Sequence, residues 1–142
     1  MIIVDASVPL AIYKGEAGAR AFEEALAQEA FVLPSITLTE IGMRVRTLTG
    51  SADRMRAYVS WLRLQSAEVI DIDAALAEAA NEAFDRYGKG TGHPARLNFG
   101  DCLVYAASQA RSLPLLFKGD DFGLTDLDLH PGSQTGRGTP QP

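Results

Sequence analysis

The sequence IIVDASVP, residues 2–9, joins a short apolar run to an aspartate and then to the first turn of a helix. The run has the length of a strand. Ser7 can cap a helix and Pro9 is tolerated in its first turn, so a helix is predicted to follow the strand directly. Asp5 thus lies at the carboxyl end of a strand, where open α/β sheets bind their ligands. It is explained equally well as a turn and capping residue, and its position alone does not decide between the two.

Other apolar runs of strand length occur along the chain, and longer segments of helical periodicity separate them. The runs are Ile2–Val4, Phe31–Leu33, Val69–Ile72 and Leu115–Phe117. Apolar side chains with helical spacing are Met55, Tyr58, Val59 and Leu62; Leu76, Ala80, Ala83, Phe84 and Tyr87; and Leu103, Ala106, Ala107 and Ala110. Strands joined by helices form right-handed crossovers. The predicted fold class is α/β, a sandwich with a central parallel sheet flanked by helices.

The length and composition indicate one domain. The chain has 142 residues, of which 46% are hydrophobic, and its composition shows no internal break. Such a length supports one buried core, so we predict a single domain over residues 1–130. Residues 131–142 are rich in Gly, Pro, Ser, Thr and Gln. We expect this tail to be disordered, because it cannot bury enough apolar surface to offset the entropy of ordering.

The cysteine content and the apolar segments predict the compartment. Cys102 is the only cysteine, which excludes an intramolecular disulfide and a zinc site built from several thiolates. The run before Asp5 is short and has no basic leader, and no segment has the apolar length of a membrane span. We therefore expect a cytoplasmic protein that does not enter a membrane.

The charge distribution matters more than the formal net charge of −5, which by itself argues against nucleic-acid binding. Arginines gather on the predicted helices between residues 44 and 63, namely Arg44, Arg46, Arg54, Arg56 and Arg63. The glycine-rich segment from Tyr87 to Leu97 is predicted to be an exposed loop carrying Lys89, His93 and Arg96. These positions define a candidate basic face, although a solvated helix surface explains the arginines as well.

Two acids are predicted in the first turns of helices. Glu40 comes three residues after Thr37, and the sequence TLTE matches a capping box. Asp101 comes three residues after Asn98 and is favoured there by the helix dipole, by about 0.3–1 kcal/mol. Each of these acids, taken alone, therefore has a structural explanation.

Asp120 and Asp121 follow the last apolar run through a turn, where adjacent acids are common. All the acids nevertheless lie just beyond strands or in first helical turns, which a parallel sheet gathers at one edge. Carboxylates that converge there repel one another unless a cation compensates their charge. Oxygen ligands without a Cys/His cluster select Mg²⁺ or Mn²⁺ over Zn²⁺. Because Mg²⁺ pairs with phosphates, the sequence points to phosphate-ester chemistry.

Other catalytic residue types fit poorly. His93 and His130 are far apart in the sequence and are not expected to form a metal pair. Ser7 lacks a G-x-S-x-G elbow and a partner base, so a capping or supporting role is preferred over a nucleophilic one.

The motifs taken together, in their order, resemble PIN-domain ribonucleases of the VapC toxin type. They are IIVDAS at residues 2–7, the helical Glu40, YGKG at 87–90 leading to LNFGDC at 97–102, and LLFKGDDF at 115–122. The match extends over about residues 1–129. The resemblance implies a PIN-like α/β/α sandwich, endonuclease activity on RNA, and a homodimer inhibited by a cognate antitoxin protein. A groove around Ile36–Leu64 is the expected antitoxin site.

The resemblance also assigns roles to the acids. Asp5, Glu40 and Asp101 match the acidic positions of the family, and the fourth position is Asp121, with Asp120 as the alternative. The implied cofactor is Mg²⁺ or Mn²⁺, held by Asp5, Asp101 and one of the two adjacent aspartates. Glu40 holds a second ion or orients a water. In-line attack of water on the phosphodiester then leaves a 5′-phosphate and a 3′-hydroxyl.

The same resemblance implies supporting and substrate-binding residues. The supporting residues are Ser7, Asn98, Thr125 and Asp126. The residues expected to hold backbone phosphates, without recognising the base sequence, are Arg44, Arg46, Lys89, Arg96 and Lys118.

Three other classes of protein share part of this pattern. A phosphoaspartyl hydrolase of the haloacid-dehalogenase type needs an aspartate two residues after Asp5, where this chain has Ser7. A response-regulator receiver would account for Lys118 but needs paired acids near the first strand. A PIN-like domain that binds RNA or a protein partner without cleaving anything stays open, since its acids would only cap helices.

Overall fold

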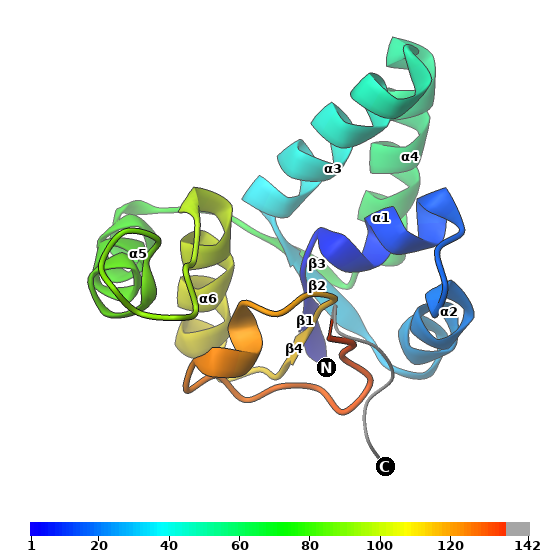
Figure 1. Cartoon of the computed structure of the whole chain (residues 1–142). Helices are drawn as coiled ribbons and strands as arrows, with labels where there is room; N and C mark the ends of the chain where they lie inside the picture. The colour runs from blue at the N-terminus through cyan, green and yellow to red at the C-terminus, as the bar shows by residue number, and fades with distance from the viewer. Residues whose placement is uncertain (136–142) are drawn as a thin grey trace.

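A parallel sheet lies between layers of helices in the computed structural model, which describes residues 1–135 (Figure 1). The strands of this described part are β1 (Ile2–Val4), β2 (Phe31–Pro34), β3 (Glu68–Ile70) and β4 (Leu115–Leu116). Their order is β3-β2-β1-β4, and every pairing is parallel. The predicted α/β sandwich is confirmed. Because β1 is a central strand, the residue that follows it lies in the middle of the carboxyl edge of the sheet.

The helices are divided between the two faces of the sheet. They are α1 (Ser7–Lys14), α2 (Ala19–Gln28), α3 (Ser35–Thr49), α4 (Ala52–Gln65), α5 (Ala74–Tyr87) and α6 (Phe99–Arg111), and a short 3₁₀ turn, η1, spans Phe122–Leu124. Helices α5 and α6 cover one face, while α1 and α2 lie on the other, and α3 and α4 project from the sheet as a helical hairpin (Figure 1).

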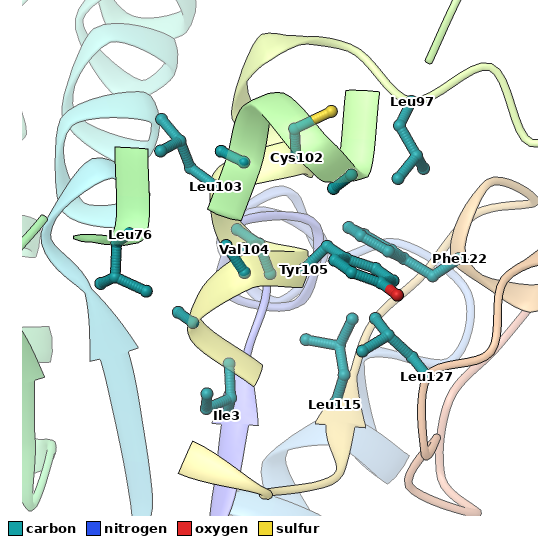
Figure 2. Packing of buried hydrophobic residues seen from close by; sticks show 14 of the residues in the cluster. Ile3, Leu76, Leu97, Cys102, Leu103, Val104, Tyr105, Leu115, Phe122 and Leu127 are labelled. Carbon is teal, nitrogen blue, oxygen red and sulfur yellow. The ribbon is translucent and has the colours of Figure 1, made fainter. Parts of the chain in front are cut away.

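Alternating side chains of the strands divide the core into two clusters. Ile3 and Val32 pack with residues of α5 and α6, whereas Ile2, Val4 and Leu33 pack with residues of α1 to α4. Figure 2 shows the first cluster gathered around α6. The strands have only two to four residues each, and a backbone hydrogen bond contributes about 0.5–1.5 kcal/mol net. Burial of the strand side chains, at about 1.5–3 kcal/mol each, therefore stabilises the sheet more than its hydrogen bonds do.

The chain after His130 continues beside β4. Parallel bridges join Leu115 to Leu129 and Lys118 to Gln134, and the Ser133 hydroxyl donates a hydrogen bond to the carbonyl of Leu115 at 3.1 Å. The packed chain thus extends past the predicted domain boundary at residue 130. Residues 136–142 of the expected disordered tail lie outside the described residues.

Two predicted caps are wrong. Helix α3 begins at Ser35 with Pro34 at its N-cap, so Thr37 lies inside the helix and Glu40 in the second turn. Thr37 is fully buried, and the predicted capping box places the N-cap three residues too late, at Thr37 instead of Pro34. Ala6, not Ser7, is the N-cap of α1.

The loop between Tyr87 and Leu97 is only partly exposed, contrary to the prediction. Ala95 and Leu97 are fully buried, and the Leu97 N–H donates to the carbonyl of Tyr87 at 2.9 Å. Apolar side chains anchor the loop, and Lys89 and Arg96 are exposed on it. On α5, the predicted apolar face is correct except for Phe84, which is 44% exposed. Within residues 1–135, no helix is long and apolar enough to span a membrane.

Candidate active site

Asp5 follows the central strand β1 and lies at the carboxyl edge of the sheet, with 9% of its surface exposed. The Ser7 N–H donates a hydrogen bond to Oδ2 of Asp5 at 3.0 Å. Burial raises the pKa of the Asp5 carboxyl, hydrogen bonds from Ser7 oppose this rise, and the charge of Asp121 adds to it. Asp5 is therefore a turn residue that bonds Ser7, as its position after the strand suggested. It is also a buried acid whose pKa is raised by the nearby charge of Asp121.

Glu40 on α3 and Asp101 on α6 belong to the same acidic group. Burial raises the pKa of Glu40 to about 7, and the charge of Asp5 contributes. The pKa of Asp101 also rises to about 7, first through burial and then through the charges of Asp5, Asp121 and Glu40. Carboxyl groups that affect one another in this way lie near one another, although they come from distant parts of the sequence.

Asp121 is the fourth member of this group. Its charge raises the pKa of both Asp5 and Asp101, whereas the charge of Asp120 raises the pKa of Asp121. Burial raises the pKa of Asp121, and the charge of Arg96 opposes this rise. The effect of its charge on Asp5 and Asp101 thus favours Asp121 over Asp120 as the acid that faces the others.

Asp101 also performs the structural role that its position suggested. The Asn98 side chain accepts a hydrogen bond from the Asp101 N–H at 2.9 Å, and Oδ2 of Asp101 accepts one from the Asn98 N–H at 3.1 Å. These two bonds form a capping box at the start of α6. The capping and site interpretations are therefore compatible, because the cap fixes the orientation of the carboxylate.

Gly100 makes room for Glu40 beside α6. A methyl group built on Gly100 would overlap Oε1 of Glu40, so no larger residue fits there while Glu40 keeps its position. Sequence reasoning missed this glycine, although it stands in LNFGDC next to Asp101.

The chemistry of this donor set suits a hard divalent cation. All four members, Asp5, Glu40, Asp101 and Asp121, offer oxygen ligands. Burial is the main cause of their raised pKa values, and the charges of neighbouring acids, which a cation would compensate, add to it. Within residues 1–135, no three His, Cys, Asp or Glu side chains stand close enough to hold an ion as they are. The carboxylates would have to move closer together to share one. The residues fit Mg²⁺ or Mn²⁺ in type.

The basic residues proposed to bind phosphates differ in their surroundings: Arg96 lies near Asp121, whereas Lys118 is paired with Glu16. Arg96 is exposed and near enough to Asp121 to affect its pKa, and it has a positive φ of 54°, which costs a non-glycine residue about 1–2 kcal/mol. Arg44, Arg46 and Lys89 are exposed, the first two on α3. Lys118 instead donates to Glu16 at 2.7 Å, which links the end of β4 to the α1–α2 connection.

The predicted supporting residues form specific contacts. The Ser7 hydroxyl accepts a hydrogen bond from the Lys118 N–H at 2.9 Å, joining α1 to the segment after β4. The Thr125 hydroxyl donates to the carbonyl of Phe122 at 2.7 Å. Asp126 bonds Tyr105 and Arg86. Tyr105 and Arg86 were not identified from the sequence, although Tyr105 stands one helical turn after Asp101.

Comparisons with known proteins agree with this arrangement. The sequence profile of the PIN domain matches residues 2–126. A VapC ribonuclease of Rhizobium meliloti is 37% identical over 141 residues, covering 89% of this chain and 99% of the relative. The solved structure of VapC20 of Mycobacterium tuberculosis, described as a sarcin-ricin loop cleaving toxin, has a TM-score of 0.74 at 19% identity and covers 92% of this chain and 100% of that one. A toxin–antitoxin complex from Klebsiella pneumoniae has a TM-score of 0.70 at 18% identity and covers 94% and 99% of the two chains.

A parallel sheet that brings four acids from separate segments to one edge defines a candidate acidic site on an α/β fold. The chain belongs to the PIN-domain family. Within that family it is similar to the VapC ribonucleases, as its motifs had indicated. The solved structures, at under 25% identity, support the fold alone.

Proposed function

We propose that this protein is a divalent-metal-dependent endoribonuclease, the toxin of a toxin–antitoxin pair. One observation carries the proposal: Asp5, Glu40, Asp101 and Asp121 come from four segments and act on one another at the carboxyl edge of the sheet. Helix capping alone does not account for that convergence. Asp101 caps α6 and Asp5 accepts a bond from the first residue of α1, but Glu40 lies in the second turn of α3. The similarity to VapC ribonucleases supports RNA as the substrate.

Asp5, Asp101 and Asp121 are the proposed ligands of Mg²⁺ or Mn²⁺. When bound, the cation would supply charge compensation and polarise the scissile phosphodiester. Glu40, whose pKa is about 7, can accept the proton of the attacking water at neutral pH. Arg96, beside Asp121, is positioned to hold a backbone phosphate without distinguishing bases.

The test is cleavage of an RNA panel by the purified full chain with Mg²⁺, Mn²⁺ or a chelator. We expect cleavage that needs the metal and leaves 5′-phosphate ends, which a ligation specific for 5′-phosphates detects. Asp5→Asn should abolish it while the circular dichroism spectrum stays unchanged. Asp71→Asn is the matched control, because Asp71 follows the edge strand β3 as Asp5 follows β1 but is exposed. Full cleavage by Asp5→Asn, or cleavage that persists in chelator, would overturn the proposal.

The antitoxin is proposed to bind beside the α3–α4 hairpin. A cavity of about 360 Å³ lies where α4 meets α1 and α2, and its apolar lining includes Leu26, Tyr58, Trp61 and Leu62. Trp61 is 51% exposed and its ring stacks on that of Tyr58 with centroids 5.9 Å apart. Hydrogen exchange with and without the cognate antitoxin should show protection of α4. Protection confined to α5 and α6 would place the antitoxin elsewhere.

A further inference from the structure

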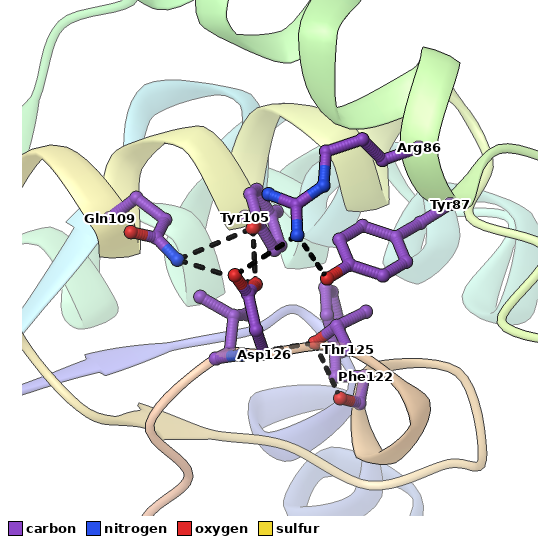
Figure 3. A network of polar contacts seen from close by, with 8 residues as sticks. Arg86, Tyr87, Tyr105, Gln109, Phe122, Thr125 and Asp126 are labelled. Carbon is purple, nitrogen blue, oxygen red and sulfur yellow. Dashed lines mark hydrogen bonds and ion pairs between the residues drawn. The ribbon is translucent and has the colours of Figure 1, made fainter.

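A polar network ties the segment that carries Asp121 to helices α5 and α6 (Figure 3). Its centre is the carboxylate of Asp126. One oxygen accepts hydrogen bonds from the Tyr105 hydroxyl and, at 3.5 Å, from Gln109, both on α6. The other oxygen accepts a bond from Arg86 of α5 at 3.3 Å. A single exposed side chain thus joins three separate parts of the chain.

The α6 end of this network is rigidly connected to the acidic group. Tyr105 comes four residues after Asp101, so the two side chains lie on the same face of α6, one turn apart. The ring of Tyr105 is buried, 5.5 Å from that of Tyr87 between centroids, and it lies in the same cluster as Phe122 and Leu127 (Figure 2). Packing therefore leaves the Tyr105 hydroxyl little freedom to move relative to Asp101.

The other end of the network is braced as firmly. Asp126 comes five residues after Asp121, and the chain between them is closed by local bonds. The Thr125 hydroxyl donates to the carbonyl of Phe122 at 2.7 Å and accepts from the Leu127 N–H at 3.3 Å. Phe122 is buried against Phe117, with ring centroids 5.3 Å apart. A displacement of Asp126 would therefore be passed to Asp121.

Arg86 extends the same network toward Arg96. Its guanidinium donates to the Tyr87 hydroxyl at 2.8 Å and lies 4.8 Å from the centre of the Tyr87 ring. The carbonyl of Tyr87 in turn accepts the Leu97 N–H at 2.9 Å, next to Arg96. The loop that presents Arg96 is thus anchored at the same point as the turn that presents Asp121.

We propose that Asp126 is a positioning residue of the candidate active site. Held by Tyr105 and Arg86, its carboxylate sets the position of Asp121 relative to Asp101 and thereby the affinity of the site for a divalent cation. The inference rests on the proposed function, since it assigns Asp101 and Asp121 to that cation. Residues that orient metal ligands from behind commonly change affinity by about 10–100-fold when they are lost.

The test is Mn²⁺ binding to the full chain, measured by isothermal titration calorimetry, together with thermal unfolding of the metal-free protein. Asp126→Asn removes the charge that binds Arg86, and Tyr105→Phe removes only the hydroxyl while keeping the packed ring. Each should weaken Mn²⁺ binding by about tenfold or more. The matched control is Glu68→Gln, because Glu68 also binds an arginine, Arg111 of α6, at 2.6 Å, but at the amino end of β3. It should bind Mn²⁺ like the wild type.

A merely structural Asp126 would give a different result. If Asp126→Asn and Tyr105→Phe lower the melting temperature but bind Mn²⁺ like the wild type, the inference is overturned. Should Asp126→Asn fail to fold, Tyr105→Phe decides alone. Cleavage of RNA by the wild type, measured in parallel, keeps the two proposals separate: absence of cleavage with intact Mn²⁺ binding contradicts the proposed nuclease, whereas unchanged binding in the variants contradicts the role of Asp126.

Discussion

The α-carbon of Gly100 lies directly against the carboxylate of Glu40, so closely that a methyl group on Gly100 would overlap Oε1 of Glu40. The glycine belongs to the first turn of α6 and Glu40 to the second turn of α3. This contact joins α3 and α6 at the acidic group. Glu40 can take its observed position only because Gly100 has no side chain.

Gly100→Ala should therefore separate activity from stability. Alanine favours helix by up to about 1 kcal/mol over glycine, and the flexible end of Glu40 can move aside. We expect a melting temperature equal to or above that of the wild type, but a large loss of RNA cleavage. Ser108→Ala, further along α6, is a control for changes within the helix. Full activity of Gly100→Ala would show that the position of Glu40 does not matter.

Asp121→Asn and Asp120→Asn should differ strongly, although the two residues are adjacent. The charge of Asp121 raises the pKa of Asp5 and of Asp101, so its loss removes a proposed ligand and should reduce cleavage by at least about 100-fold. Asp120→Asn should retain most activity. Initial cleavage rates at saturating Mn²⁺ measure both variants. Comparable losses in the two would contradict the assignment of Asp121.

The stability of the metal-free protein should depend on pH in a defined direction. The pKa values of Glu40 and Asp101 rise from 4.5 and 3.8 to about 7 on folding. The folded state thus binds more protons than the unfolded one between about pH 4 and 7, and the stability conferred by these protonated groups is lost as pH rises through 7. The free energy of unfolding should fall there by at most about 1.4 kcal/mol for each pH unit and each group.

Mg²⁺ or Mn²⁺ should reverse that loss above pH 7, by about 2.7 kcal/mol at a free concentration 100 times Kd. Asp101→Asn should flatten the pH dependence and shrink the metal response. Melting curves at pH 5 and 8 with and without Mn²⁺ provide the measurement. If Asp101 serves only as a cap, the variant will instead lose about 0.3–1 kcal/mol and keep the full metal response.

Replacing Arg96 should show that its strained backbone angle is kept because Arg96 binds RNA. Its φ of 54° is unfavourable for arginine, whereas glycine adopts such an angle freely. Arg96→Gly should raise the melting temperature while increasing KM for RNA and lowering the salt dependence of binding by about one charge. Arg96→Lys should keep the salt dependence of the wild type. An unchanged KM in Arg96→Gly would remove Arg96 from the RNA surface.

The apolar surface beside α6 should support a homodimer. Phe99 is 76% exposed and, with Phe84, lines a cavity of about 420 Å³ between α5 and α6. Exposed aromatic patches of this kind mark interaction surfaces. Light scattering at micromolar concentration should give the mass of a dimer for the wild type and of a monomer for Phe99→Asp. Leu64→Asp, at a residue 82% exposed on α4, controls for a new surface charge. A monomeric wild type would rule the dimer out.

Apolar periodicity was sufficient to predict the sheet and most helices, because strand side chains such as Ile3 and Val32 must be buried wherever the sheet forms. Asp5 and Asp121 could be found from their positions after strands, and Glu40 and Asp101 from their positions near the starts of helices. The local sequence pattern gave wrong predictions for residues whose environment is set by tertiary contacts. Thr37 looked like a cap but is covered by the core, and Leu97 looked like a loop residue but anchors its loop.

The contacts around Asp126 could not be predicted for a related reason. Arg86 and Asp126 are 40 residues apart, and nothing in the local sequence of either indicates the other. Lys118 was grouped with the phosphate-binding residues because of its charge, whereas the structure pairs it with Glu16, 102 residues away. Such pairings arise only when the sheet has brought the segments together.

The position of β4 has a consequence for synthesis of the protein. Strand β1 emerges from the ribosome first, yet one of its two neighbours is β4, the last strand of the described chain, and Asp121 follows it. A nascent or truncated chain that stops before residue 115 has Asp5, Glu40 and Asp101 but an open edge at β1 and no fourth acid. The four acids of the candidate site can therefore come together only after the chain has been synthesised through Asp121.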